Sequence, residues 1–477
     1  MRSKRVEPDT SDREGIGMHE RDIVVIGGGS AGYRAASRAS QLGGKVILVE
    51  REKLGGTCVN WGCIPMQFLL RNAALVHLMK EVEEDGINIG KVDIDYSRLM
   101  AAKSAVVKST TDRIQSNLKA SNVEVIRGKG RLVLPNLVEV EREDGSREVF
   151  SAKKDILAPG SVAKRLSMPG AEGKGVITTK EALEISSVPK SAVIIGGGVI
   201  GLELATFWVN LGCAVSVVEI APQIIPNEDH DLASSTEQTL RGDGVQIYTG
   251  AEVDRIDDVK GGKSVSVSDA GARHRLEAEI AVFAMGHSPR VEGLGLENAG
   301  IGISKGRIQT NNRMGTNVEG IYATGDVTGE IMLASVAMAQ GTVAAENAMG
   351  ANATMDYRVV PRCIRTLPEI GAVGITEKEA IEKELDVKVG KYPFTRNAKA
   401  PMLRERSGFV KVIADSTSGE VLGVHIIGPQ ATELIHEAVV VMQMRGTVQD
   451  VAAAIHSHPS LHEAIQQAAQ QLVRQGK

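Results

Sequence analysis

Cysteine is scarce in this chain. Its 477 residues include 4 cysteines, at positions 58, 63, 213 and 363. That number is far too small for a disulfide framework in a protein of this length, so the sequence points to a reducing cytoplasm. In such a compartment, two cysteines with four residues between them, Cys58 and Cys63, indicate a catalytic or metal-binding pair rather than a structural bridge.

Other features are also missing. The formal net charge is -4 and no dense run of lysine and arginine occurs, which disfavours a nucleic-acid partner. The first 20 residues contain acidic residues and lack an apolar segment, so we expect a flexible extension there and neither a secretory signal nor a transit peptide. Three glycines, Glu203 and Asn210 interrupt the apolar stretch 192–218, which fits a buried strand, turn and helix better than a membrane span.

Length and composition indicate an ordinary globular protein. A prior of about 150 residues per domain suggests roughly three domains. The 42% of hydrophobic and 24% of charged residues are typical of folded chains. The 52 glycines, many of them clustered after β-branched runs, point to turns that bind phosphate groups.

An internal duplication organises the first half of the chain. Each copy contains a strand, a glycine turn, a helix and a second strand that ends in glutamate. The first copy, 21–50, has strands at 23–26 and 46–49 around Gly27, Gly29 and Gly32, and ends at Glu50. The second copy, 192–219, has strands at 193–195 and 215–218 around Gly196, Gly198 and Gly201, and ends at Glu219. In both copies the last glycine precedes the glutamate by 18 positions.

This arrangement predicts two dinucleotide sites. The glycines let the backbone approach a pyrophosphate, the helix N-terminus offers N–H groups, and the carboxylate can accept hydrogen bonds from ribose hydroxyls. The alternative is a pair of ordinary βαβ packing turns. Two sites suggest two different dinucleotides, and Glu219 would repel the 2′-phosphate of NADP and so favour NAD.

The sequence changes in character beyond about Met355. Alternating strands at 409–413 and 421–427 are joined by the turn 416–419, and a helix at 432–444 ends before Gly446. We expect an α+β domain without a nucleotide signature, suited to contact between subunits.

The cysteine pair lies in the string GGTCVNWGCIP, residues 55–65. A cysteine at the start of a helix gains thiolate stabilisation from the dipole, and this spacing allows a disulfide across one helical turn. The alternatives are a pair of buried thiols or half of a metal site, although the chain has no second cysteine pair to complete a tetrahedral site.

These motifs resemble the pyridine nucleotide-disulfide oxidoreductases, and within that family the dihydrolipoamide dehydrogenases, from about Arg21 to the C-terminus. Further matches are Gly325-Asp326, Pro368-Glu369 and the string HSHPSLHE, residues 456–463. The resemblance implies an α/β protein with two Rossmann-like domains and a C-terminal α+β dimerisation domain. Its boundaries would be 21–160 (FAD, first part), 161–285 (NAD), 286–355 (FAD return or central segment) and 356–477 (interface).

The resemblance also implies the residues that bind the cofactors. FAD would be held by Gly27, Gly29, Gly32, Glu50, Gly56, Thr57, Gly130, Ser161, Gly325 and Asp326, with Asp326 at the ribityl chain. NAD would be held by Gly196, Gly198, Gly201, Glu203, Glu219 and Gly286.

Four catalytic residues follow from the same resemblance. Cys58 would be the interchange thiol that meets substrate and Cys63 the charge-transfer thiol beside the flavin. His458 would be the general acid/base and Glu463 its orienting partner, reaching the cysteines of the neighbouring subunit in a homodimer. The three histidines at 456, 458 and 462 are alternatively metal ligands, and Glu463 alternatively completes a helix capping box with Ser460.

The implied reaction oxidises dihydrolipoamide and reduces NAD, with a lipoylated carrier protein as substrate and neither membrane nor metal involved. His458 would deprotonate a substrate thiol, whose thiolate attacks Cys58 and releases Cys63. The electron pair would then pass through the flavin to NAD.

Two departures from the family pattern bear on activity. Met66-Gln67 stands where the family has Ser-Lys, and that lysine pairs with the glutamate found here as Glu203, so we expect Glu203 to lack its partner. Pro159 replaces a threonine and is expected to alter the hinge into the NAD domain.

Four rival functions are considered. A mercuric reductase would carry C-terminal cysteines, which this chain lacks, and Glu219 opposes the NADP of glutathione reductase. A lipoamide dehydrogenase for a stand-alone lipoyl protein and an electron-transfer flavoprotein without turnover both stay open.

Overall fold

The computed structural model describes residues 19–405 and 407–475. Its contacts divide the chain into two compact units, and each unit is built from three separate segments. The first unit comprises Met1–Ile64, Ala105–Val162 and His287–Asp356; the second comprises Pro65–Ser104, Ala163–Gly286 and Tyr357–Lys477. Residues 1–18 of the expected N-terminal extension lie outside the described residues, and the domain boundaries given above stay a prediction.

A mixed sheet forms the centre of the first unit. Its strand order is β3-β2-β1-β6-β5-β4, and β19 pairs with β6. The strands are β1 (His19–Ile26), β2 (Val46–Glu50), β3 (Glu124–Arg127), β4 (Lys129–Leu134), β5 (Leu137–Glu141), β6 (Arg147–Leu157) and β19 (Ile321–Ala323). The apolar run Ile23, Val24 and Val25 is fully buried. A continuous β-branched run is typical of a parallel strand covered on both faces.

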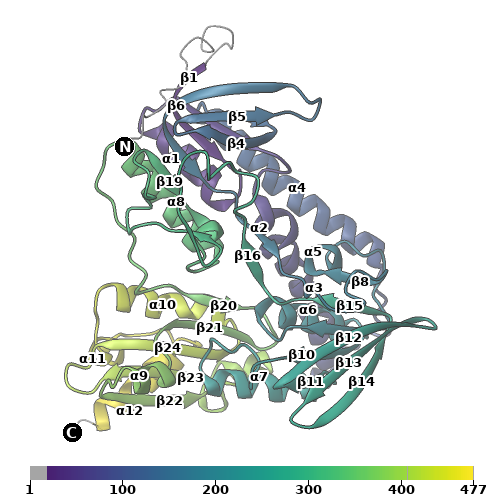
Figure 1. Cartoon of the computed structure of the whole chain (residues 1–477). Coiled ribbons are helices and arrows are strands. Elements are labelled where there is room, and N and C mark those ends of the chain that lie inside the picture. Colours follow the sequence, from purple (N-terminus) through teal and green to yellow (C-terminus); the bar gives the residue numbers. More distant parts are fainter. Residues whose placement is uncertain (1–18, 406, 476–477) are drawn as a thin grey trace, which may run out of the picture. The chain divides into compact units, whose positions relative to one another are not determined.

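Two helices pack closely beside this sheet. α1 (Ser30–Gln41) follows β1, and α8 (Ala334–Ala348) lies against it (Figure 1). Gly341 permits the contact, because a Cβ atom there would lie 2.3 Å from the Ala31 carbonyl oxygen. Arg38 and Glu346 join the helices by an ion pair of 2.6 Å. The remaining short elements of this region are β7 (Ser161–Ala163), β16 (His287–Pro289), β17 (Ile303–Ser304), β18 (Arg307–Ile308), α2 (Gly56–Trp61) and η3 (Gly325–Thr328).

The second unit contains a parallel sheet with strand order β11-β10-β9-β15-β8. Its strands are β8 (Val176–Thr178), β9 (Ser191–Ile195), β10 (Ala214–Glu219), β11 (Gln246–Thr249) and β15 (Ile280–Phe283). The helices here are α5 (Thr179–Ala182), α6 (Val199–Asn210) and α7 (His230–Gly242). An antiparallel layer of β12 (Ala251–Val259), β13 (Gly262–Asp269) and β14 (Ala272–Ala278) accompanies the sheet (Figure 1).

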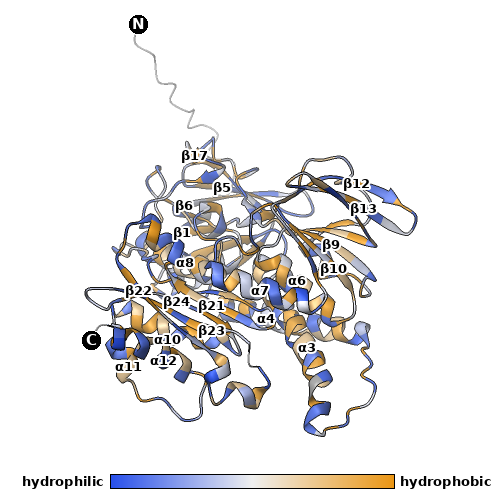
Figure 2. Ribbon diagram, turned by 90° about the horizontal axis from the view of Figure 1, so that it is seen from below, coloured by the Kyte–Doolittle hydropathy of each residue, from blue (hydrophilic) through white to orange (hydrophobic). Residues whose placement is uncertain are grey.

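α6 forms much of the core of this unit. Phe207 and Trp208 are buried in one cluster with Met66 and Leu69 of α3 (Cys63–Glu81). Figure 2 shows the hydrophobic character of α6 beside the strands of the sheet. The expected buried strand, turn and helix in 192–218 is therefore confirmed. Within the residues that the structure describes, no helix combines the length and hydropathy needed to cross a membrane.

The C-terminal segment forms an antiparallel sheet with order β20-β21-β24-β23-β22. The strands are β20 (Arg362–Ile364), β21 (Glu369–Gly374), β22 (Val387–Pro393), β23 (Phe409–Asp415) and β24 (Val421–Gly428). The helices are α9 (Glu377–Glu382), α10 (Ala431–Gln443), α11 (Val448–Ala453) and α12 (Glu463–Gln475), with η4 (Phe394–Arg396) and η5 (Ala400–Leu403). The strands predicted at 409–413 and 421–427 and the helix predicted at 432–444 are confirmed within two residues, as is the predicted α/β and α+β architecture.

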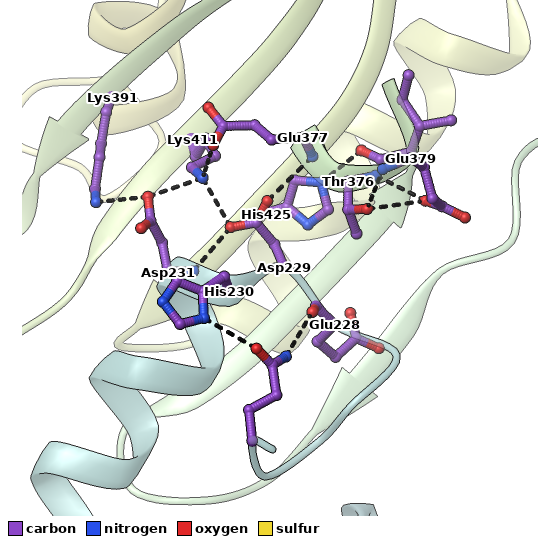
Figure 3. Close-up of polar contacts among 12 residues, drawn as sticks. Glu228, Asp229, His230, Asp231, Thr376, Glu377, Glu379, Lys391, Lys411 and His425 are labelled. Atoms are coloured by element: carbon purple, nitrogen blue, oxygen red, sulfur yellow. Dashed lines mark hydrogen bonds and ion pairs between the residues drawn. The ribbon is translucent and has the colours of Figure 1, made fainter. Parts of the chain in front are cut away.

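A buried lysine of the antiparallel sheet contacts the start of α7 and α9 in the second unit. The Lys411 ammonium contacts Asp229 at 2.7 Å, Asp231 at 2.8 Å and Glu377 at 3.1 Å, and its side chain is 1% exposed (Figure 3). Burial would raise the pKa of Asp231, but hydrogen bonds from Lys411 and Lys391 outweigh it and lower that pKa to about 2. The pKa of Asp229 is likewise lowered, so both aspartates are ionised at neutral pH beside the Lys411 ammonium.

Candidate active site

The first glycine turn and its glutamate are tied together by hydrogen bonds. Glu50, the last residue of β2, accepts from the backbone N–H of Gly28 at 2.6 Å and of Glu52 at 2.6 Å. Gly27 has a φ of +104°, and a Cβ atom at Gly32 would lie 1.7 Å from the Gly27 carbonyl oxygen. Both positions therefore require glycine if α1 is to begin directly beside β1.

The second turn repeats this geometry. Glu219, the last residue of β10, accepts from the N–H of Gly197 at 2.7 Å and of Ala221 at 2.8 Å. Gly196 has a φ of +115°, and a Cβ atom at Gly201 would lie 2.0 Å from the Gly196 carbonyl oxygen. The duplication in the sequence is thus a duplication of backbone conformation and of hydrogen bonding.

Both turns fit a dinucleotide. A Cβ atom at Gly198 would meet nothing within 4 Å, and one at Gly29 would meet only the Gly56 Cα atom, at 3.8 Å. The backbone at each helix N-terminus is therefore open to an approaching pyrophosphate. Each carboxylate keeps lone pairs for ribose hydroxyls, because two backbone N–H groups occupy only part of its accepting capacity.

The cysteine pair lies directly beside the first turn. Gly55 donates a backbone hydrogen bond to Gly28 at 2.8 Å, and a Cβ atom at Gly56 would approach the Gly29 Cα atom to 2.8 Å. This backbone-to-backbone contact holds α2, and with it Cys58, against the start of α1.

The sequence suggested that the two cysteines lie on one helix, but the structure places them on two. Cys58 is the third residue of α2, Cys63 is the first residue of α3, and Gly62 separates the helices with φ -140° and ψ -115°. A hydrogen bond between the two sulfur-bearing side chains lowers the pKa of Cys58, and burial opposes that shift. The interruption at Gly62 thus keeps the thiols in contact, as reversible disulfide formation requires.

Three of the other FAD candidates in the first unit, Ser161, Gly325 and Asp326, make hydrogen bonds to neighbouring residues. The Ser161 hydroxyl donates to Asp326 at 2.6 Å, and the Gly325 N–H donates to the buried Gln340 at 2.7 Å. The first of these hydrogen bonds holds the side chains of Ser161 and Asp326 together. Thr57, in contrast, has an exposed side chain on α2. A Cβ atom at Gly130 would lie 3.2 Å from the Val49 side chain, so close packing already accounts for that glycine.

His458 is paired with Glu463, as expected for an acid/base residue and its orienting partner. His458 Nδ1 lies 3.0 Å from Glu463 Oε1, and Glu463 Oε2 accepts from the Ser460 N–H at 2.8 Å. The hydrogen bond with His458 is the main reason that the pKa of Glu463 lies below its usual range. Glu463 therefore makes the backbone contact of a capping box while it holds His458, whose side chain is 72% exposed.

Glu203 is hydrogen-bonded to a main-chain donor, and the expectation that it lacks the family's lysine partner stays a prediction. Its carboxylate accepts from the backbone N–H of Arg365 at 3.0 Å, and burial raises its pKa to about 7. Met66 is buried in the core, and the side chain of Gln67 is half-buried on α3. Gly286, another NAD candidate, has a φ of +78°, and a Cβ atom there would meet nothing within 4 Å. Sequence reasoning missed Arg365, because a backbone donor leaves no trace in residue type.

A family model now decides the identity of this arrangement. Residues 21–341 match the model described as pyridine nucleotide-disulphide oxidoreductase. The chain belongs to this family. Residues 360–469 match the dimerisation domain of the same oxidoreductases.

Full-length relatives of this oxidoreductase agree with the assignment. A dihydrolipoyl dehydrogenase of Bacillus subtilis is 38% identical over 461 residues, covering 94% of this chain and 97% of the relative. A dihydrolipoyl dehydrogenase of Thermus scotoductus is 39% identical, covering 96% and 98%. The HOCl-induced flavoprotein disulfide reductase RclA of Escherichia coli, solved as a Cu(II) complex, superposes with a TM-score of 0.86 at 27% identity, covering 95% and 100%.

The oxidoreductase is therefore a flavin-dependent enzyme of the dihydrolipoyl dehydrogenase type, and FAD and NAD(H) are its cofactors. Among the described residues, no three or more His, Cys, Asp or Glu side chains gather as a metal ion would need.

Proposed function

We propose that this oxidoreductase transfers electrons from a dihydrolipoamide-type dithiol to NAD through a Cys58–Cys63 disulfide. The contact between the two cysteines beside the first glycine turn carries this proposal. FAD, which the first glycine turn and Glu50 would hold, would supply the electron-accepting and hydride-transfer chemistry between the dithiol and NAD. The names of the relatives, dihydrolipoyl dehydrogenases, support a lipoyl substrate.

The residues of the chain perform the thiol chemistry. In the oxidised enzyme Cys58 and Cys63 are joined by a disulfide, and His458 takes the proton of one substrate thiol. The resulting thiolate attacks the Cys58 sulfur, a mixed disulfide forms, and Cys63 leaves as a thiolate with the bonding electron pair. The second substrate thiol then displaces Cys58 and its proton passes to the leaving Cys58 sulfur, so that the substrate leaves as a cyclic disulfide and the enzyme holds a Cys58 thiol, a Cys63 thiolate and a protonated His458.

Glu463 and the chain partner complete the proposal. The carboxylate of Glu463 stabilises the imidazolium that forms when His458 takes the proton. The match of residues 360–469 to a dimerisation domain supports a homodimer in which His458 serves the cysteine pair of a second copy. A lipoylated carrier protein is the proposed physiological dithiol.

We assign the remaining candidates to the two cofactors. The first turn with Glu50, together with Ser161 and Asp326, would hold FAD, and the second turn with Glu219 would hold NAD. Glu219 favours NAD, because its carboxylate would repel the 2′-phosphate of NADP.

Stopped-flow reduction tests this function. Mixing the holoenzyme with dihydrolipoamide should produce a long-wavelength thiolate-to-flavin absorbance, followed by NADH formation after NAD is added. Cys58→Ser and Cys63→Ser should each abolish the reaction, whereas Cys363→Ser, on β20, should leave it unchanged. An enzyme that fails with free dihydrolipoamide and with purified lipoylated carrier domains contradicts the proposal.

Two observations favour a second candidate, the reverse reaction. The likeness to a disulfide reductase along 95% of the chain, together with Gln67 in place of the family lysine, fits an enzyme that uses NADH to reduce a disulfide. A comparison of kcat/KM in the two directions with lipoamide and dihydrolipoamide distinguishes the two. A flavoprotein without turnover would show neither.

A further inference from the structure

A glutamate on α10 binds the two histidines that flank His458 in the sequence. Glu437 Oε1 lies 2.9 Å from His456 Nε2, and Glu437 Oε2 lies 2.7 Å from His462 Nδ1. The two imidazole rings are stacked, with 6.2 Å between centroids and 20° between planes. The Glu437 carboxylate therefore closes the segment 456–462 into a loop with His458 near its middle.

The contacts of His456 indicate its charge. Its Nε2 atom faces the Glu437 carboxylate, and its Nδ1 atom lies 3.2 Å from the Ala454 carbonyl oxygen. Both neighbours are acceptors only, and a neutral imidazole carries one N–H. The imidazolium form alone donates to both, so this geometry favours the imidazolium at His456, whose side chain is 11% exposed.

Further contacts fix the backbone on both sides of His458. The Gln466 amide donates to the Ala454 carbonyl at 2.6 Å, and the Asn397 amide donates to the Ser460 carbonyl at 2.9 Å. His456 thus shares the Ala454 acceptor with α12, which also carries Glu463. The backbone before and after His458 is therefore hydrogen-bonded to other segments of the same unit.

We propose that Glu437 and His456 form a positioning pair for His458, in which Glu437 holds His456 as the imidazolium and thereby fixes the segment 454–459. His462 shares the same carboxylate but is 45% exposed, so it contributes less. The inference rests on the proposed acid/base role of His458 and is independent of which dithiol is the substrate.

The pair also acts on the partner of His458. The hydrogen bonds of His458 and Ser460 are the main causes that lower the pKa of Glu463, and the positive charge of His456 adds to them. The ionisable groups around this network are Glu437, His462, Glu463 and Tyr392 of β22. Burial raises the pKa of Tyr392; the charge of Arg396 opposes that shift, and the charge of Glu463 adds to it. Removal of the His456 charge should therefore let Glu463 take up a proton at a higher pH.

The test is a pair of half-reactions measured on the holoenzyme. Glu437→Gln and His456→Gln should each slow the thiol-driven reduction of the cysteine disulfide about tenfold, part of the 10²–10⁴ that a positioned base provides. NADH-driven flavin reduction should be unchanged, because it does not use His458. Glu433→Gln, the same change one turn earlier on the exposed face of α10, is the matched control and should change neither rate.

Two more measurements separate positioning from general loss of structure. The double variant should be no slower than either single variant, since residues that act as one unit are not additive. The acid limb of the rate–pH profile should move to higher pH in His456→Gln but not in His462→Gln. Glu437→Asp, which keeps the charge on a shorter side chain, should give an intermediate rate and guards against a misfolded Gln variant.

Each contrary result has a definite meaning. Additive losses in the double variant, or an unchanged thiol half-reaction in both single variants, overturn the positioning pair. The half-reaction is run with dihydrolipoamide and with dithiothreitol. If dithiothreitol reduces the wild-type enzyme and dihydrolipoamide does not, the proposed lipoyl substrate is contradicted. The Glu437–His456 pair is then tested by the rates with dithiothreitol.

Discussion

The Glu203 carboxylate accepts a hydrogen bond from the backbone N–H of Arg365, with 3.0 Å between the two atoms. Burial raises the pKa of Glu203 from 4.5 to about 7, while this hydrogen bond and the charge of Arg365 oppose the shift. The folded protein thus binds this proton more tightly than the unfolded chain does. The ionised carboxylate lowers stability as pH rises from 4.5 to about 7, by an amount that approaches about 3 kcal/mol above that range.

Glu203→Gln should therefore stabilise the protein only at higher pH. The amide keeps an oxygen for the Arg365 N–H and carries no charge. We expect a higher Tm than the parent at pH 8 and no gain at pH 5, measured by thermal unfolding of the holoenzyme. An equal change at both pH values would mean that the carboxylate is not protonated in the folded state.

Gln67→Lys should restore the charge pair that the family resemblance implies. A lysine at this position is expected to pair with Glu203, which would lower the carboxyl pKa and add positive charge near the redox centre. The flavin reduction potential should rise by about 30 mV, equivalent to a tenfold change for a two-electron couple. Spectroscopic titration against a reference dye measures the shift, and Gln67→Met, which adds no charge, should leave the potential near that of the parent.

Alanine in the two glycine turns should separate the two cofactors. Gly32→Ala should prevent FAD binding, because its Cβ atom would lie 1.7 Å from a backbone oxygen, and flavin absorbance of the purified protein reports the loss. Gly201→Ala should retain FAD and lose NADH binding, for the same reason at 2.0 Å.

Gly242→Ala provides the control for these two variants. A Cβ atom at Gly242, on α7, would meet nothing within 4 Å. Both cofactors should bind this variant normally. Retention of NADH by Gly201→Ala would contradict the assignment of the second turn.

Lys411→Met should destabilise the second unit strongly. It would leave the buried Asp229 carboxylate without its cation, and removal of one partner of a buried ion pair costs about 3–5 kcal/mol. Lys391→Met is the matched comparison, because Lys391 is 45% exposed and contacts Asp231 at 2.9 Å. An exposed ion pair contributes about 1 kcal/mol or less. Urea unfolding should show the difference, and equal losses would contradict the importance of burial.

The duplicated turns could be predicted from the sequence because they depend on residue type. Gly27 and Gly196 adopt a positive φ, which favours glycine, and continuous β-branched runs form the buried strands. Glu50 and Glu219 were found by their spacing from the glycines. Such features are local, and local features leave a pattern in the sequence.

Features that depend on backbone atoms or on distant segments could not be predicted in this way. The break at Gly62 assigns the cysteines to two helices, although their spacing also suited one helix. The Arg365 donor belongs to the main chain, and Glu437 lies 19 residues before His456 in the sequence. Neither the residue type nor the position of Glu437 on α10 gave a reason to connect it with the histidines.

The hydrogen bonds of Glu219 to Gly197 and Ala221 have a consequence for the evolution of coenzyme preference. Substitution of Glu219 to admit NADP would leave two main-chain donors without their acceptor, and an unsatisfied buried donor such as the Gly197 N–H costs about 1–3 kcal/mol. A route from one coenzyme to the other would therefore need a second, compensating change in the same loop. The carboxylate that we propose to bind the ribose also stabilises this loop, and selection on either role would constrain the other.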